Sequence, residues 1–457
     1  MIKKKNIQIN FYVFLFIHLL IWTLIPSITN LNLPLDTIEA LAWGSNLDWG
    51  FNKHPPLSAF FVELFYQIFG NQDWSYYLLS QIFIIFSFFI VWKFSQDFFS
   101  NKFHSLISVL LLEAIVFHNY STPEFNVYIC QLPFKALAVY FCWKSIKEGN
   151  YLNWILFGFS SALGFLSHYL FIFLLFAFVI FFIKTIYDEK KINFKYLIPL
   201  IVFLIVISPH IIWLLSNNFA SIDYGISRTN FKEFSINDNF TNPIYFILKQ
   251  LGLLIPFFVV FLLLIKKFKI KINFKDKKLM FLFIINILPL LLVFLTSFLA
   301  GIKIRTMWMS SFYLFFGVLV VYLFQKQIDL LRFKSFLISF LVLFLLYPAA
   351  YLYVSISKTD KRTDYPGSEI AYLVQEKWDK NFSNEIKLVI GDEWFGGNLS
   401  YHLISRPTWI DSLDSRLDQV QISGGVVYVG NPSVLKKICP GIYGTIKPVG
   451  ICMIGSK

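Results

Sequence analysis

The amino-acid sequence predicts a polytopic α-helical membrane protein with a small α/β domain at its C-terminus. Three observations support this fold class. Of the 457 residues, 57% are hydrophobic and 55 are phenylalanine, which is more apolar surface than one water-soluble core can bury. The apolar residues gather in about eleven stretches, each close to the roughly 20 residues that a helical crossing of a bilayer requires. Residues 355–457 lack such stretches and alternate between helix and strand patterns.

The predicted transmembrane helices all lie in residues 1–354, which we assign to one membrane domain. They cover residues 8–27, 75–94, 104–119, 126–144, 152–167, 169–186, 196–215, 243–265, 279–300, 308–325 and 335–354. The first is expected to be a retained helix rather than a cleaved signal peptide, because no small-residue cleavage site follows it. Residues 33–75, between the first two helices, are polar enough to form surface helices.

Lysine and arginine residues predict the orientation of the helices, because positively charged loops stay on the cytoplasmic side. One set of alternate loops holds 21 basic residues, including the run KKFKIKINFKDKK at 266–278, whereas the opposite set holds five. The N-terminus is therefore expected in the cytoplasm. An odd number of crossings then places the C-terminal domain on the outer side.

The net charge of +13 does not indicate a nucleic-acid partner. Residues 355–457 carry 12 basic and 11 acidic residues, so nearly all of the excess charge belongs to the membrane domain, mostly to its cytoplasmic loops. Topology and contact with anionic membrane lipids explain basic residues there. No soluble segment combines a basic face with interleaved aromatic residues, so we expect no nucleic-acid partner.

Residues 355–457 are expected to form a separate α/β domain. PGSEIAYLVQEKWDKNF has helical spacing, IKLVIGDEWFGGNLSYHLI reads as strand, glycine-containing turn and helix, and GGVVYVG reads as a second strand. The glycine spacing fits neither a Walker motif nor a dinucleotide fingerprint, which favours a structural or acceptor-binding role. Glycines and prolines between Cys439 and Cys452 indicate a hairpin, so these cysteines are disulfide candidates in an oxidising compartment.

Acidic side chains gather on the outer side, where orientation does not require charge. LDTIEALAWG has helical spacing that places Asp36 and Glu39 on one face. Asp36 is also consistent with an ordinary helix start. Glu124, the only acidic residue in HNYSTPEFNV, either begins the next helix or belongs to the same site as Asp36. Two ionisable residues, Glu113 and Lys135, fall inside predicted crossings, where each either has a function, reaches the membrane interface or pairs with a neighbour.

Basic residues reach the same outer side at several points. His54 precedes Pro55-Pro56, His168 lies in GFLSHYLF, and Lys303 and Arg305 lie in GIKIRTMWM. Carboxylates together with cations at the mouth of a helical bundle favour a transferase with a lipid-phosphate donor. The cations would hold phosphate oxygens, and arginine does so bidentately. A carboxylate would take the proton of an acceptor hydroxyl that attacks the anomeric carbon, which inverts this centre without a covalent intermediate.

The ordered set LDTIEALAWG…KHPPLSAFFVELFYQIFG, TPEFNV and LGFLSHYLF resembles the GT-C glycosyltransferases. The resemblance is to the branch related to protein O-mannosyltransferases (glycosyltransferase family 39-like) and to bacterial lipid A aminoarabinose and core galacturonosyl transferases. It covers about residues 30–320. It implies a hexosyl- or pentosyltransferase of the bacterial inner (plasma) membrane with a polyprenyl-phosphate-linked donor and a periplasmic active site. The C-terminal domain would then be periplasmic, and the acceptor would be lipid A, lipopolysaccharide core or another glycan rather than a protein.

The resemblance also implies roles for individual residues. Asp36 matches an acidic residue that acts as base or organises the acceptor, Glu39 matches the second acidic position, and Glu124 stands where many members have aspartate. Five residues are expected to contact the donor phosphate: Lys53, His54, His168, Lys303 and Arg305. His168 departs from the Ser-Lys-Tyr that is common at its position, so a phosphate contact there requires a protonated imidazole. Three aromatic residues are assigned to the substrate pocket: Trp43, Tyr120 and Trp308.

Cofactor use and two rival functions remain open at this point. Either no cofactor is required, or a divalent cation is held by some of four residues: Asp36, Glu39, His54 and Glu124. A membrane transporter or lipid-linked sugar flippase is the first rival, but it predicts polar residues near the bilayer midplane and paired repeats. A scaffold that presents the C-terminal domain is the second rival, and it gives no reason for the clustered charges.

Overall fold

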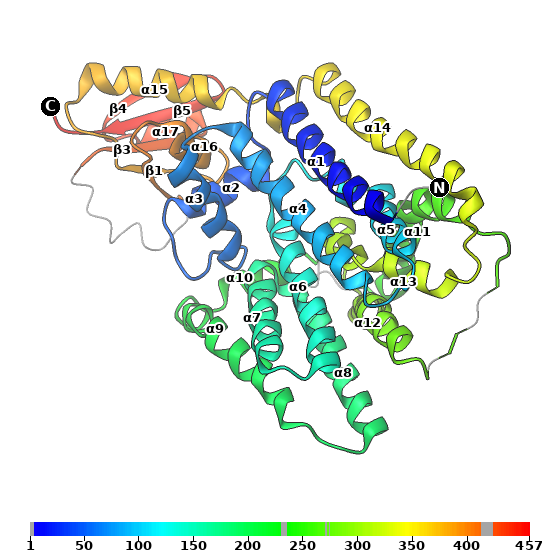
Figure 1. The fold of residues 1–457 in the computed structure, drawn as a ribbon. Helices are drawn as coiled ribbons and strands as arrows, with labels where there is room; N and C mark the ends of the chain where they lie inside the picture. Colours follow the sequence, from blue (N-terminus) through cyan, green and yellow to red (C-terminus); the bar gives the residue numbers. More distant parts are fainter. Residues whose placement is uncertain (1–3, 230–234, 270–271, 274, 413–423) are drawn as a thin grey trace.

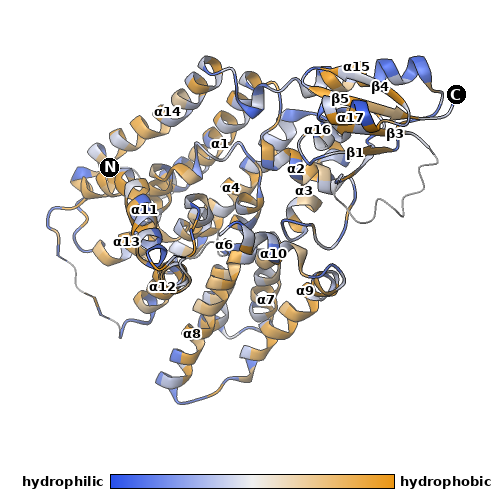
Figure 2. Cartoon of the chain, turned by 180° about the vertical axis from the view of Figure 1, so that it is seen from behind, coloured by the Kyte–Doolittle hydropathy of each residue, from blue (hydrophilic) through white to orange (hydrophobic). Residues whose placement is uncertain are grey.

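The computed structural model describes residues 4–229, 235–269, 272–273, 275–412 and 424–457. It contains a helical domain and a smaller α/β domain that packs against one end of it (Figure 1). The predicted fold class is confirmed. Figure 2 shows hydrophobic residues along the long helices, and hydrophilic residues on the outermost helix of the α/β domain.

Each of the eleven predicted stretches contains a helix of the membrane domain. These helices are α1 (Lys4–Thr29), α4 (Asp73–Ser95), α5 (Lys102–Leu110), α6 (Val127–Glu148), α7 (Tyr151–Ser167), α8 (Ile172–Glu189), α9 (Leu197–Ser216), α11 (Asp238–Leu262), α12 (Lys277–Ala300), α13 (Phe316–Phe324) and α14 (Phe333–Ser357). Not all of them are full crossings. Among the described residues, seven helices are long and apolar enough to span a membrane, or eight if Thr306–Tyr313 and α13, bent by 55°, form one broken span. The predicted number of eleven is therefore approximate.

The predicted helix at 104–119 is interrupted where ionisable and polar side chains enter the protein interior. α5 ends at Leu110 and continues as 3-10 turns at Leu111–Ala114 and Val116–His118. Glu113 is 1% exposed, and its Oε1 lies 2.5 Å from His18 Nδ1 on α1. Lys135 on α6 is also buried and places its Nζ 3.6 Å from the centroid of the Phe312 ring. Both intramembrane residues therefore have partners inside the protein, which avoids the cost of charge in lipid.

Three short helices cover one end of the membrane domain. α2 (Leu35–Gly44) begins after Pro34, α3 (Leu57–Phe69) begins after Pro56, and α10 (Ala220–Ser227) follows α9. Proline fixes φ and lacks an N–H, so it favours the first positions of a helix. Gly70 ends α3 with φ 66°, a left-handed value that glycine adopts without steric cost.

The α/β domain has a five-stranded sheet in the order β2-β1-β3-β5-β4. Its strands are β1 (Leu388–Ile390), β2 (Thr408–Ile410), β3 (Val426–Gly430), β4 (Ile442–Ile446) and β5 (Val449–Ile454). β1 pairs in parallel with β2 and β3, whereas β5 pairs antiparallel with β3 and β4. Its helices are α15 (Gly367–Asn381), α16 (Phe395–His402) and α17 (Pro432–Ile438). Cys439 and Cys452 form a disulfide that joins the end of α17 to β5.

The α/β domain is docked onto α2 and α3 through close and polar contacts. A Cβ added at Gly397 on α16 would lie 3.0 Å from Ile38 Cγ2, so glycine allows α16 to approach α2. Arg406 pairs with Glu63 of α3 at 2.7 Å and also donates to the carbonyl of Leu41 at 2.7 Å. This docking places the loop after β1 next to the mouth of the membrane domain.

Candidate active site

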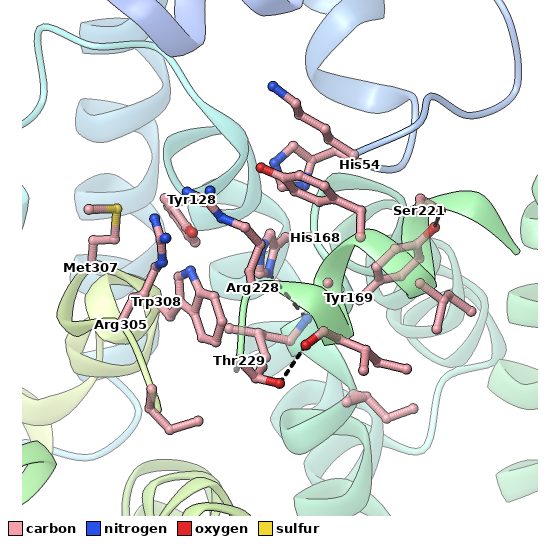
Figure 3. A pocket seen from close by; sticks show the side chains of 18 of the residues that line it. His54, Tyr128, His168, Tyr169, Ser221, Arg228, Thr229, Arg305, Met307 and Trp308 are labelled. Atoms are coloured by element: carbon pink, nitrogen blue, oxygen red, sulfur yellow. Dashed lines mark hydrogen bonds between the residues drawn. The ribbon is translucent and has the colours of Figure 1, made fainter. Parts of the chain in front are cut away.

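A cavity of about 810 Å³ lies beneath α2, between the membrane helices and α10 (Figure 3). Its polar lining consists mainly of Asp36, Glu39, Lys53, His54, Tyr128, His168, Tyr169, Ser221, Tyr224, Arg228, Thr229, Arg305 and Trp308. Its apolar lining includes Phe165, Leu170, Ile172, Phe173, Val293, Ile302 and Ile304. Since α8 and α12 supply part of the apolar lining, the cavity joins a polar chamber to a region lined by membrane helices.

Asp36 and Glu124 form a carboxylate pair at one wall of this cavity. The backbone N–H of Asp36 donates to Glu124 Oε1 at 3.0 Å, which holds the two acidic residues side by side although 88 positions separate them. Burial, with the Glu124 carboxylate as the second cause, raises the pKa of Asp36 above its ordinary value. Burial also raises the pKa of Glu124. Both carboxyl groups therefore keep a proton to higher pH than exposed carboxyl groups do.

Glu124 itself faces a second cavity, of about 340 Å³, on the other side of the same wall. Tyr120, Ser355 and Arg362 also line it, and Tyr120 contacts the Tyr351 ring with centroids 5.6 Å apart. Tyr120, predicted to lie in the substrate pocket, is thus close to the carboxylate pair but outside the larger cavity. The wall between the two cavities is formed by Leu35, which lines both, and by the carboxylate pair.

Lys53 occupies the polar chamber between two carboxylates. Its Nζ donates to Glu39 Oε1 at 2.9 Å and also to Glu393 Oε2, which the α/β domain supplies. Burial alone would lower the pKa of Lys53, but the carboxylates of Glu39 and Glu393 raise it above the ordinary value. Burial raises the pKa of Glu393 to about 7, with Glu39 as the next cause. Lys53 therefore stays charged while it lines the cavity.

The two histidines of the cavity are better suited to neutral contacts than to charge. Burial, together with the smaller effects of the cations Lys53 and Arg228, lowers the pKa of His54 to about 3. His168 uses Nδ1 to accept the Leu170 N–H at 3.2 Å, which a doubly protonated imidazolium is unable to do. The expected charged contact between His168 and phosphate is therefore not favoured. The His54 and His168 rings lie 5.8 Å apart between centroids, so they form one aromatic surface.

Arginine side chains supply further positive charge. Arg305 lines the cavity beside Trp308, as the sequence predicts, and Arg228 joins it from the end of α10. Figure 3 shows both side chains extending toward Tyr128. Arg228 was not among the predicted site residues. It is one of only five basic residues in the loops that the sequence predicts to lie on the outer side, so this scarcity was the signal that would have identified it.

Two predicted site residues lie elsewhere. Lys303 is exposed and lines neither cavity, although its backbone N–H donates to the carbonyl of Thr229 at 3.3 Å. Trp43 also lines neither cavity. Its ring stacks on Phe51 with centroids 5.5 Å apart, and its Nε1 donates to Glu393 Oε1 at 3.3 Å. Trp43 thus supports the chamber from behind rather than contacting its interior.

The candidate metal ligands do not converge. Within the described ranges, no three His, Cys, Asp or Glu side chains are arranged to hold a metal ion. Glu39 is engaged by Lys53, and Glu124 directs an oxygen at the backbone N–H of Asp36. The four residues do not fit a metal site as they stand, so no catalytic step is derived through a metal.

Comparisons with known proteins support the fold described above. Residues 53–213 match the family model described as dolichyl-phosphate-mannose-protein mannosyltransferase. No curated protein sequence matches the chain. Two similar solved structures are those of ArnT from Cupriavidus metallidurans. In the complex with undecaprenyl phosphate, identity is 11%, the TM-score is 0.66, and 99% of this chain and 98% of that chain are covered. In the apo state, identity is 10%, the TM-score is 0.65, and 97% of each chain is covered. These findings confirm the predicted resemblance: the protein has the fold of the GT-C glycosyltransferases.

Proposed function

We propose that the protein transfers a sugar from a polyprenyl-phosphate-linked donor to an acceptor hydroxyl on the periplasmic side of the bacterial inner membrane. The observation that carries this proposal is a single cavity that is apolar between membrane helices and cationic beneath a carboxylate pair. The match to the mannosyltransferase family model and the fold shared with ArnT support a glycosyltransferase with a lipid-linked donor.

The donor would lie with its prenyl chain in the apolar part of the cavity and its phosphate in the polar part. Its prenyl chain would lie along the apolar lining supplied by α8 and α12, where burial of hydrocarbon is favourable. Its phosphate would then reach the polar chamber, where Lys53, Arg228 and Arg305 provide charge-assisted hydrogen bonds. This placement brings the sugar close to α2. A polyprenyl phosphate as ligand is supported by the similar ArnT structure, which was solved with undecaprenyl phosphate bound.

The carboxylate pair supplies the base. An acceptor oxygen attacks the anomeric carbon, the bond from this carbon to the phosphate oxygen breaks, and the electron pair leaves with the polyprenyl phosphate. Asp36 takes the proton of the acceptor hydroxyl, and a raised pKa makes it a stronger base than an exposed aspartate. Attack from the face opposite the phosphate inverts the anomeric centre. Glu124 tunes Asp36 and orients it through the backbone N–H.

The second cavity gives the acceptor a separate route to the same pair. Glu124 and Tyr120 line it, and the guanidinium of Arg362 lies 4.8 Å from the centroid of the Trp394 ring at this end of the molecule. A cation in this lining favours an acceptor with anionic groups. Lipid A and lipopolysaccharide core are acceptors of this kind, and we propose them ahead of a neutral glycan or a protein.

Mass spectrometry of lipopolysaccharide from cells with and without the gene tests the proposal. We expect a mass difference of one hexose, uronic acid, pentose or amino sugar, which the gene carrying Asp36→Asn does not restore. Identical lipopolysaccharide in both strains, together with no transfer by purified protein from any polyprenyl-phosphate sugar, would contradict the proposed function. Cysteine labelling of residue 124 from outside the cell tests the orientation independently.

A further inference from the structure

The α/β domain sends one carboxylate into the active site. Glu393 lies in the turn between β1 and α16 and is 8% exposed. Its two oxygens have different partners: Oε2 accepts from Lys53 Nζ, and Oε1 accepts from Trp43 Nε1 at 3.3 Å. In sequence, 340 positions separate Glu393 from Lys53. This contact therefore depends on how the two domains dock.

Two hydrogen bonds and one close packing contact hold the α/β domain against the membrane domain near Glu393. Asn398 on α16 accepts a hydrogen bond from Asn32 at 2.8 Å, and the Trp409 N–H donates to Ser45 Oγ at 2.8 Å. Gly397 packs directly on Ile38. These contacts come from α16, which follows the turn that carries Glu393, and from β2, which pairs with β1 before the turn, so they fix its carboxylate relative to α2.

We propose that Glu393 is a positioning residue, through which the docked α/β domain clamps the Lys53 ammonium against Glu39 so that it faces the donor phosphate. The proposal rests on the proposed function, because that function makes a polyprenyl phosphate the ligand of Lys53. Lysine has four flexible side-chain bonds, and two acceptors held on separate domains restrict them before the donor arrives. Glu393 lines neither cavity, so it acts through Lys53 rather than on the substrate.

The ion pair between Lys53 and Glu393 differs from a surface ion pair of the α/β domain. Lys380 and Glu376 pair on the exposed face of α15, with side chains 68% and 44% exposed, where an ion pair contributes little. The Lys53 and Glu393 side chains are 18% and 10% exposed. Removal of a partner from the buried pair is therefore expected to have a larger effect, and Glu376→Ala is a matched control.

The test measures binding of undecaprenyl phosphate to the purified full-length protein in nanodiscs. We expect Glu393→Ala to weaken binding about tenfold, which corresponds to the loss of one hydrogen bond to a charged group. Glu393→Gln keeps an oxygen that accepts from Lys53, so it should bind within about twofold of the wild type. In a Lys53→Met background, Glu393→Ala should have no further effect, because a residue that acts only through Lys53 has nothing left to position.

The other outcomes separate a failure of the clamp from a failure of the proposed function. Wild-type affinity in Glu393→Ala, an equal loss in Glu393→Gln, or a further loss in the Lys53→Met background would overturn the clamp. Retained binding by the wild type in these cases leaves the proposed function standing. A wild-type protein that does not bind undecaprenyl phosphate would overturn the proposed function, and the clamp with it. Thermal unfolding of all variants verifies that each is folded, and Glu376→Ala should match the wild type in every measurement.

Discussion

Two regions in the described part of the chain hold ionisable side chains inside the protein, and they differ because one lines a cavity and the other lines neither of the two cavities described above. Asp36, Glu39 and Lys53 line the space of about 810 Å³ beneath α2. Glu113 and His18 lie 2.5 Å apart between α1 and the turn after α5, and they line neither of the two cavities. Both regions hold charged groups that the sequence marks as unusual. The difference shows that access to open space, and not burial of charge, separates a site from a structural contact.

Substitutions in the two regions should therefore have different effects. Lys53 is paired on two sides and still faces the cavity, so changes around it should affect ligand binding in a folded protein. Glu113 has a partner within closed packing, so its replacement should affect stability instead. Four substitutions test this division.

The largest effect is expected for Asp36→Asn. Asparagine keeps the shape of the side chain but is unable to accept a proton, so kcat for sugar transfer should fall by about 10²–10⁴-fold. Transfer of labelled sugar by protein in membranes measures this loss, and the melting temperature should remain that of the wild type. Full activity in this variant would show that Asp36 does not act as the base. The cavity would then be no better supported as a catalytic site than the region around Glu113.

Arg228→Ala should come next. Its guanidinium lies in the cavity, so its loss should raise KM for the donor about tenfold, the effect expected when one charge-assisted hydrogen bond is removed. Lys303→Ala is the matched control, because Lys303 is an exposed cation on the same side that lines neither cavity. Steady-state kinetics with varied donor compare the two. Equal effects would show that the outer charge as a whole, rather than the cavity, binds the donor.

Glu113→Gln tests the other region. The change replaces the carboxyl group that contacts His18, and disruption of a buried polar contact typically costs about 1–3 kcal/mol. We expect a lower melting temperature in nanodiscs, with kcat and KM of the folded fraction unchanged. Loss of transfer at an unchanged melting temperature would assign a function to Glu113 and abolish the division between the regions.

The smallest effect is expected from Glu124→Gln, as a shift in pH dependence. Transfer requires unprotonated Asp36, so kcat should rise with pH through the pKa of Asp36. Glu124 is the second cause that raises this pKa, and a neutral glutamine removes it while its amide oxygen still accepts the Asp36 N–H. The acidic limb of the kcat profile should therefore move to lower pH. Burial is the larger cause of the raised pKa and remains in the variant, so the shift should be partial. An acidic limb at the same pH as in the wild type would show that Glu124 does not affect the pKa of Asp36.

Much of the fold follows from local patterns in the sequence. Each apolar stretch contains a helix, and LDTIEALAWG forms α2 from Leu35 to Gly44, because helical periodicity and proline positions act within a few residues. The break after Leu110 was not predicted. Hydropathy does not report that Glu113 meets His18, 95 residues earlier in the chain, and that the backbone there forms 3-10 turns.

The sequence by itself determined the membrane class, the helical surface segment with its acidic residues, and the scarcity of basic residues in one set of alternate loops. Only the tertiary structure decided which of these residues share a space. It places Asp36 beside Glu124, and it places Arg228 and Arg305 in the cavity but Lys303 outside it. It also places Trp43 behind the polar chamber and Glu393, from the other domain, beside Lys53. The reason is physical: hydropathy and helix propensity depend on near neighbours, whereas these contacts depend on packing between segments far apart in the chain.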